Sequence, residues 1–89
     1  MSSTNKLFWL PHFERNYKKL SSEAKEKVNN ALLKMEKDLH YPSLAVKKIR
    51  GAEDIWEVRA SQSLRITFNL KGNEIYLRTV GQHDILKNP

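Results

Sequence analysis

The last third of the chain alternates between apolar and polar residues in three short segments, and this pattern constrains the fold more than any other feature. Segment 64–71 has Leu, Ile, Phe and Leu at every second position, and segments 56–61 and 75–80 follow the same period of two, which is typical of half-buried strands. Short connections, including the turn signal Lys71-Gly72-Asn73, predict an antiparallel meander. In its last strand the period places Ile75, Leu77 and Thr79 on the apolar face and Tyr76, Arg78 and Val80 on the polar face.

The residues before the meander predict one strand and two helices. Segment 6–10 is short, apolar and aromatic, as strands are. Pro11 suits the first position of a helix, and Phe13, Tyr17 and Leu20 form one helical stripe. Ser21 and Ser22 are expected to cap a second helix, which ends before Tyr41-Pro42. The predicted class is α+β, with the order β-α-α-β-β-β and both helices packed on one face of a small antiparallel sheet.

The length of 89 residues fits a single domain spanning 1–89, in which we expect residues 1–5 to be flexible. The chain has no cysteine, which excludes disulfides, cysteine zinc sites and thiol nucleophiles. No segment has the long apolar run of a membrane span, and the first residues do not resemble a signal peptide. We therefore expect a cytoplasmic protein with no membrane partner.

The composition is strongly basic, with 16 Lys and Arg against 10 Asp and Glu and a net charge of +6. Such a surplus favours a polyanionic partner such as nucleic acid, a ribosome or an acidic protein. The alternative is that the charge serves only solubility.

The polar face of the predicted meander is the best candidate for function. Two helices cannot cover both faces of so small a sheet, so we expect this face to be open. Three arginines beside a tyrosine suit phosphate contacts and base stacking, although arginines lying over aliphatic neighbours would also make a soluble surface. The polar residues predicted on this face are Glu57, Arg59, Arg65, Thr67, Asn69, Tyr76 and Arg78.

These residues fit metal-free cleavage of RNA, in which a 2′-OH attacks the adjacent phosphate. Arg65 and Arg59 would stabilise the developing charge. His83, just after the last strand, would act as general acid, and Glu57 or a lysine as base. A chance surface histidine is the alternative for His83. We interpret the other two histidines as structural or surface residues, and we expect no metal and no cofactor.

Segments 54–59, 64–68 and 77–84 resemble the RelE/ParE toxin superfamily of toxin–antitoxin systems, as do 13–20 and 46–51. The resemblance implies the same β-α-α-β-β-β fold. RelE-like members are mRNA interferases, endoribonucleases that cut mRNA on the ribosome without a metal. The implied partners are therefore mRNA, the ribosome and an acidic antitoxin, with the chain a monomer or part of a toxin–antitoxin hetero-oligomer.

The resemblance also implies roles for individual residues. Arg65 matches the arginine that contacts the scissile phosphate, and His83 the position where some members carry a catalytic histidine. Arg59 matches a basic position, and Glu57 stands near the position of lysines in RelE. The residues expected to contact RNA are Lys47, Lys48, Arg50, Tyr76 and Arg78.

Two departures keep other functions open. Glu57 near the lysine positions, and Ile85 and Leu86 where a tyrosine would be expected, imply either a different base or weakened chemistry. The ParE branch of the superfamily shares the fold but inhibits DNA gyrase. A relic that only binds its antitoxin is a third possibility.

Overall fold

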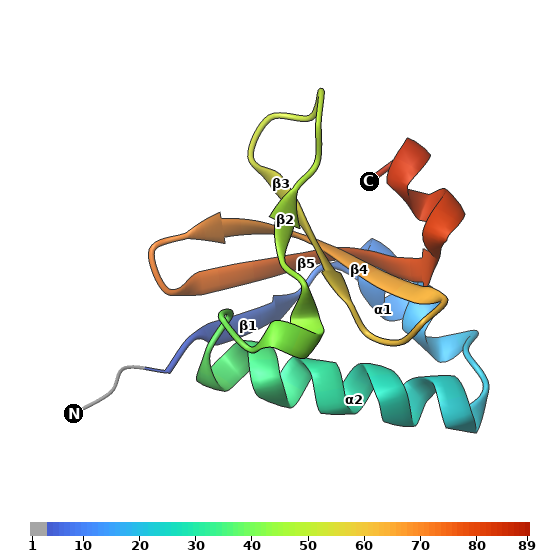
Figure 1. Ribbon diagram of the computed structural model, residues 1–89. Coiled ribbons are helices and arrows are strands. Elements are labelled where there is room, and N and C mark those ends of the chain that lie inside the picture. The colour runs from blue at the N-terminus through green and yellow to red at the C-terminus, as the bar shows by residue number, and fades with distance from the viewer. Residues whose placement is uncertain (1–3) are drawn as a thin grey trace.

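The computed structural model describes residues 4–89, which form two helices and a five-stranded sheet (Figure 1). Two short 3-10 helices, η1 and η2, complete the secondary structure of this part of the chain. The elements in chain order are β1 (Lys6–Trp9), α1 (Pro11–Lys18), α2 (Ser22–Lys37), η1 (Pro42–Leu44), β2 (Lys47–Lys48), β3 (Ile55–Arg59), β4 (Leu64–Lys71), β5 (Glu74–Gln82) and η2 (His83–Lys87).

The sheet has the order β1-β5-β4-β3-β2, and β3, β4 and β5 form the predicted antiparallel meander. The α+β class and the chain order of the predicted elements are confirmed. The sheet itself is mixed, because β1 pairs in parallel with β5. The short strand β2, between η1 and β3, pairs with β3 and forms the other edge. A two-residue strand carries too little alternation to stand out in the sequence.

The helices and the sheet enclose one hydrophobic core. The side-chain hydroxyl of Ser21 accepts a hydrogen bond from the backbone N–H of Ala24 at 3.1 Å, which confirms the predicted cap of α2. Figure 1 shows α2 running beneath the sheet. The helix α1 contacts β5 and contributes the fully buried Phe13. The other fully or nearly fully buried core residues are Val28, Ala31, Leu32, Met35, Leu44, Val58, Leu64, Ile66, Phe68, Ile75, Leu77 and Val80.

An irregularity in the pairing of β4 with β5 changes which side chains face the core. Phe68 pairs with Leu77, but Thr67 pairs with Thr79, so Arg78 is an extra residue on β5. Such a β-bulge interrupts the period of two. The placement predicted for the end of β5 is therefore wrong, because Val80 is in the core and Thr79 lies opposite Thr67 on the other face.

The N-terminal segment is attached to the rest of the molecule from Thr4 onward. The backbone N–H of Asn5 bonds to the carbonyl of Glu36 at 2.8 Å, and Thr4 accepts a bond from the side chain of Asn73 at 3.2 Å. Of the segment 1–5 that we expected to be flexible, residues 1–3 lie outside the described residues. Within residues 4–89, no helix is both long and apolar enough to cross a bilayer.

Candidate functional site

We call the side of the sheet that faces away from α2 the outer face. Residues paired directly across two strands point to the same side, so the register places Lys47, Glu57 and Thr67 in one row across β2, β3 and β4. Arg59 and Arg65 form the next row. The bulge adds both Arg78 and Thr79 opposite Thr67. Four cationic side chains and one carboxylate therefore lie on neighbouring positions.

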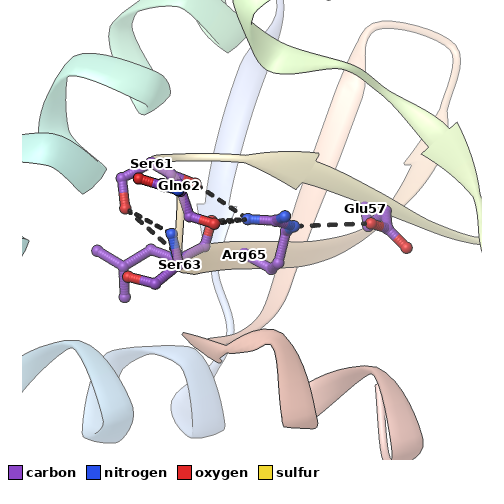
Figure 2. Close-up of polar contacts among 6 residues, drawn as sticks. Glu57, Ser61, Gln62, Ser63 and Arg65 are labelled. Carbon is purple, nitrogen blue, oxygen red and sulfur yellow. Dashed lines mark hydrogen bonds and ion pairs between the residues drawn. The ribbon is translucent and has the colours of Figure 1, made fainter.

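Arg65, one of the arginines of this face, is not open to solvent. Arg65 is only 8% exposed, and its Nη1 lies 2.9 Å from the carbonyl oxygen of Ser61 and 3.0 Å from that of Leu64. A third, longer contact of 3.3 Å reaches the carbonyl of Gln62 (Figure 2). The predicted open face is thus wrong at Arg65. The carbonyls of the β3–β4 turn, which carry no signal in the side-chain pattern, cover and bind the guanidinium.

Glu57 is the carboxylate nearest to this arginine. Its Oε1 lies 4.0 Å from Nε of Arg65, and Figure 2 shows the two side chains facing each other from adjacent strands. Glu57 is 7% exposed, and its position on β3 pairs with that of the exposed Lys47 on β2. The structure thus places Arg65, Glu57 and Lys47 at neighbouring positions of one sheet face, with the first two buried.

The middle of the outer face carries a second group of polar contacts. The hydroxyl of Thr67 and Nε of Arg78 both bond to the backbone oxygen of Pro89, at 3.1 and 3.0 Å. Nη1 of Arg78 also donates to Oδ1 of Asn69 at 2.7 Å. The segment from η2 to Pro89 therefore lies over β4 and β5 and covers part of the predicted open face.

His83 is the first residue of η2 and is exposed. Gln82, the last residue of β5, pairs with Leu64. His83 consequently leaves the sheet next to the β3–β4 turn that holds Arg65. The chain brings this histidine to the same end of the outer face as the buried arginine.

Other predicted site residues lie apart from this group. Arg59 pairs with Arg65 in the backbone register, but it is exposed at the end of β3 and lines a small hollow with Lys27 and Lys34 of α2. Lys48 pairs with Trp56, which packs against the core, so its position belongs to the opposite side of the sheet. Arg50 follows β2 in an exposed connector.

Tyr76 lies at the far end of the outer face, beyond Asn69. Its ring stacks on Phe8 with centroids 5.0 Å apart, and its hydroxyl donates to Oε1 of Glu74 at 2.8 Å. This hydrogen bond, to a carboxylate that favours the protonated phenol, raises the pKa of Tyr76 above its ordinary value. The phenol is already engaged within the protein.

Two further hollows in the described part of the chain differ in their relation to the outer face. One, of about 410 Å³, adjoins Arg78 and is lined by Leu10, Pro11, His12, Arg15, Arg78, Asn88 and Pro89. The other, of about 520 Å³, is apolar and lies away from the outer face; its lining is Leu39, His40, Tyr41, Pro42, Ala45, Val46, Trp56, Phe68 and Leu70. Among residues 4–89, no three His, Cys, Asp or Glu side chains gather as a metal site would require.

The sequence reasoning gave no role to Thr67 and none to the residues after His83. Thr67 was placed on the correct face, but its full burial depends on contacts made by the C-terminal segment. The only available signal was local: a period of two that places Val80 among arginines and Thr79 in the core indicates a bulge.

The fold matches solved toxin structures over most of its length. A chain of the RelB-RelE antitoxin-toxin complex from Methanococcus jannaschii is 17% identical, with a TM-score of 0.74 over 91% of this chain and 95% of that one. YafQ from E. coli is 9% identical, with a TM-score of 0.77 over 92% and 97%. The YoeB/ParE toxin from Agrobacterium tumefaciens is 15% identical, with a TM-score of 0.72 over 88% and 98%.

The sequence matches no family model, and no curated protein is significantly similar to it. The likeness is one of fold, which this chain shares with these RelE, YafQ and YoeB/ParE structures.

Proposed function

We propose that this protein is the toxin of a type II toxin–antitoxin pair and that it acts in the cytoplasm as an endoribonuclease on ribosome-bound mRNA. The observation that carries the proposal is the gathering of Arg65, Glu57 and Lys47 on one sheet face, with His83 at its edge. The fold supports it, because the similar structures include RelE, YafQ and YoeB toxins.

The proposed reaction needs no group beyond the side chains of this face. Glu57 takes the proton of the 2′-OH, whose oxygen attacks the adjacent phosphorus. The P–O bond to the 5′ oxygen then breaks, and His83 gives a proton to that leaving oxygen. The products are a 2′,3′-cyclic phosphate and a 5′-OH. Arg65, fixed by the turn carbonyls, supplies a positive field to the crowded phosphorane.

The proposed protein partner is an acidic antitoxin. A net charge of +6 attracts a negatively charged chain and accelerates its association. Co-purification with the product of the adjacent small gene, at low and at high salt, tests this partner. Failure of the two to bind at low salt would contradict it.

The activity is tested best at His83, because that side chain is exposed and its loss leaves the core untouched. We expect His83→Ala to lower mRNA cleavage on purified ribosomes by about 10²–10⁴-fold, the usual worth of a general acid. His40→Ala is the matched control, since His40 is also exposed but bonds to Asp38 beyond α2. Equal cleavage by the wild-type protein and His83→Ala would remove the histidine from the mechanism.

One observation favours a second candidate, a protein that binds an antitoxin but does not cut RNA. Arg65 and Glu57 are buried and Arg78 is engaged with Pro89, so the site is occupied by the protein's own groups. Harmless overexpression of the folded wild-type protein, with no ribosome-dependent cleavage, would select this candidate. Gyrase-dependent DNA damage would instead select the ParE-type function.

A further inference from the structure

Two donors on the outer face converge on a single oxygen atom. The Thr67 hydroxyl and Nε of Arg78 lie 3.1 and 3.0 Å from the backbone oxygen of Pro89. A hydroxyl and a guanidinium directed at one oxygen bind an anionic oxygen more strongly than a neutral carbonyl, because the hydrogen bond from the arginine is charge-assisted. The pair therefore suits an anionic oxygen such as one of a phosphate group.

The geometry of this pair does not depend on Pro89. Asn69 accepts a 2.7 Å hydrogen bond from Nη1 of Arg78 and so holds the guanidinium from the side of β4. The bulge fixes Arg78 opposite Thr67, and Asn16 of α1 holds the neighbouring Thr79 through a 2.8 Å bond to its hydroxyl. The two donors would stay in place if the C-terminal segment moved away.

The segment that supplies the oxygen is lightly attached. None of the residues of η2 is buried, and Lys87 and Asn88 are exposed. The segment approaches the sheet at Gly81, where a Cβ would lie 2.7 Å from Cγ2 of Ile85. Short 3-10 helices with few buried contacts open at low free-energy cost. Once it opens, the hydroxyl of Thr67 and the guanidinium of Arg78 lose their shared partner oxygen and become accessible to a ligand.

We propose that Thr67 and Arg78 form a phosphate-binding site that residues 83–89 close, with the Pro89 oxygen standing in for a phosphate oxygen. The proposal rests on the proposed function in one respect, that the phosphate belongs to RNA. The adjoining hollow of about 410 Å³, which Arg15 also lines, favours a chain of phosphates over a single anion, since a further cation continues from Arg78. The C-terminal segment and RNA then compete for the same two donors.

The test uses the full chain and two probes, inorganic phosphate and a single-stranded oligonucleotide of 2′-deoxyriboses. The second probe lacks the attacking 2′-OH, so binding is read independently of cleavage. NMR follows the Nε–H of Arg78 and the backbone amide of Asn88 during titration. We expect both probes to shift the arginine signal and to release Asn88 from its bond to Ile85.

Three substitutions examine the two donors and the closing segment. Thr67→Val and Arg78→Gln should each weaken binding by about tenfold, the equivalent of one charge-assisted hydrogen bond. Gly81→Ala should strengthen binding severalfold, because the clash with Ile85 displaces the segment and raises the competent fraction. Lys71→Gln, which removes an exposed charge from the same strand as Thr67, is the control and should change affinity little.

The proposal is overturned if Thr67→Val and Arg78→Gln bind both probes like the wild-type protein. Thr67→Ser keeps the hydroxyl and should keep the binding, which separates loss of the donor from loss of the fold. Competition by polyglutamate with no binding of the oligonucleotide would assign the site to an acidic protein and overturn the RNA assignment. Intact phosphate binding without mRNA cleavage would contradict the ribonuclease alone and support this site.

Discussion

Two arginines of the outer face, Arg65 and Arg78, are both held by backbone oxygens, but these oxygens come from different parts of the chain. The guanidinium of Arg65 is bound by carbonyls of Ser61, Gln62 and Leu64, all within four residues of it in the chain. Arg78 is bound by the oxygen of Pro89, eleven residues away, at the end of a segment with no buried residue in its helix. The first arginine is part of a turn, whereas the second is held by a cover that can be removed.

The largest effect is expected at the first of these arginines. Arg65→Ala leaves the carboxylate of Glu57 and the turn carbonyls without their cation, which should lower the free energy of unfolding by about 3 kcal/mol. The midpoint of urea unfolding measures this loss. Arg65→Lys keeps the charge but not the guanidinium's fork of donors. Its loss of unfolding free energy should fall between that of Arg65→Ala and none. A loss as small as that of Arg78→Gln would abolish the distinction between the two arginines.

A smaller loss of stability, about 1 kcal/mol or less, is expected for Arg78→Gln, because its partner oxygen can turn to solvent. The effect should appear locally instead. Hydrogen exchange at the amide of Asn88, which bonds to Ile85, should become faster, while exchange in β4 stays unchanged. Unchanged exchange at Asn88 would mean that the C-terminal segment is held by contacts other than this arginine.

The smallest effect is expected at Tyr76. This residue also lies on the outer face, but the partner of its hydroxyl is the side chain of Glu74. The folded pKa of Tyr76 lies above the unfolded one because the Glu74 carboxylate accepts a hydrogen bond from the protonated phenol. Its contribution to stability is therefore complete below the unfolded pKa of about 10 and is lost as the pH rises through the folded value. Ultraviolet titration of the phenols should show one late tyrosine, absent from Tyr76→Phe. Glu74→Gln should return that pKa towards normal.

The side of the sheet that packs on the core was predictable, because the buried apolar side chains recur at every second residue of a strand. Ile66, Phe68 and Leu77 occupy the positions that the alternation assigns to them. The parallel pairing of β1 with β5 was not predictable, since the residue types of a four-residue strand do not indicate whether its neighbouring strand runs parallel or antiparallel. Nor was the outcome at Val80, where one inserted residue reverses every later assignment on the strand.

The sequence predicted which residues lie on the outer face, but it did not predict how far they are exposed. Glu57, Arg65 and Arg78 lie on the face where the alternation places them. Their covering consists of backbone oxygens, from the turn and from Pro89, and any residue type can supply these. The pattern of side chains along the sequence does not indicate such contacts with backbone oxygens. The roles proposed for Arg65, His83, Arg59 and Glu57 remain predictions for the experiments above.

The pairing of β1 with β5 has a consequence for how the protein comes into being. Lys6 finds its partner Glu74 only after nearly all the chain has been synthesised. Contacts so distant in sequence form slowly and late. A nascent chain therefore cannot complete its sheet before the segment that forms β5 has left the ribosome.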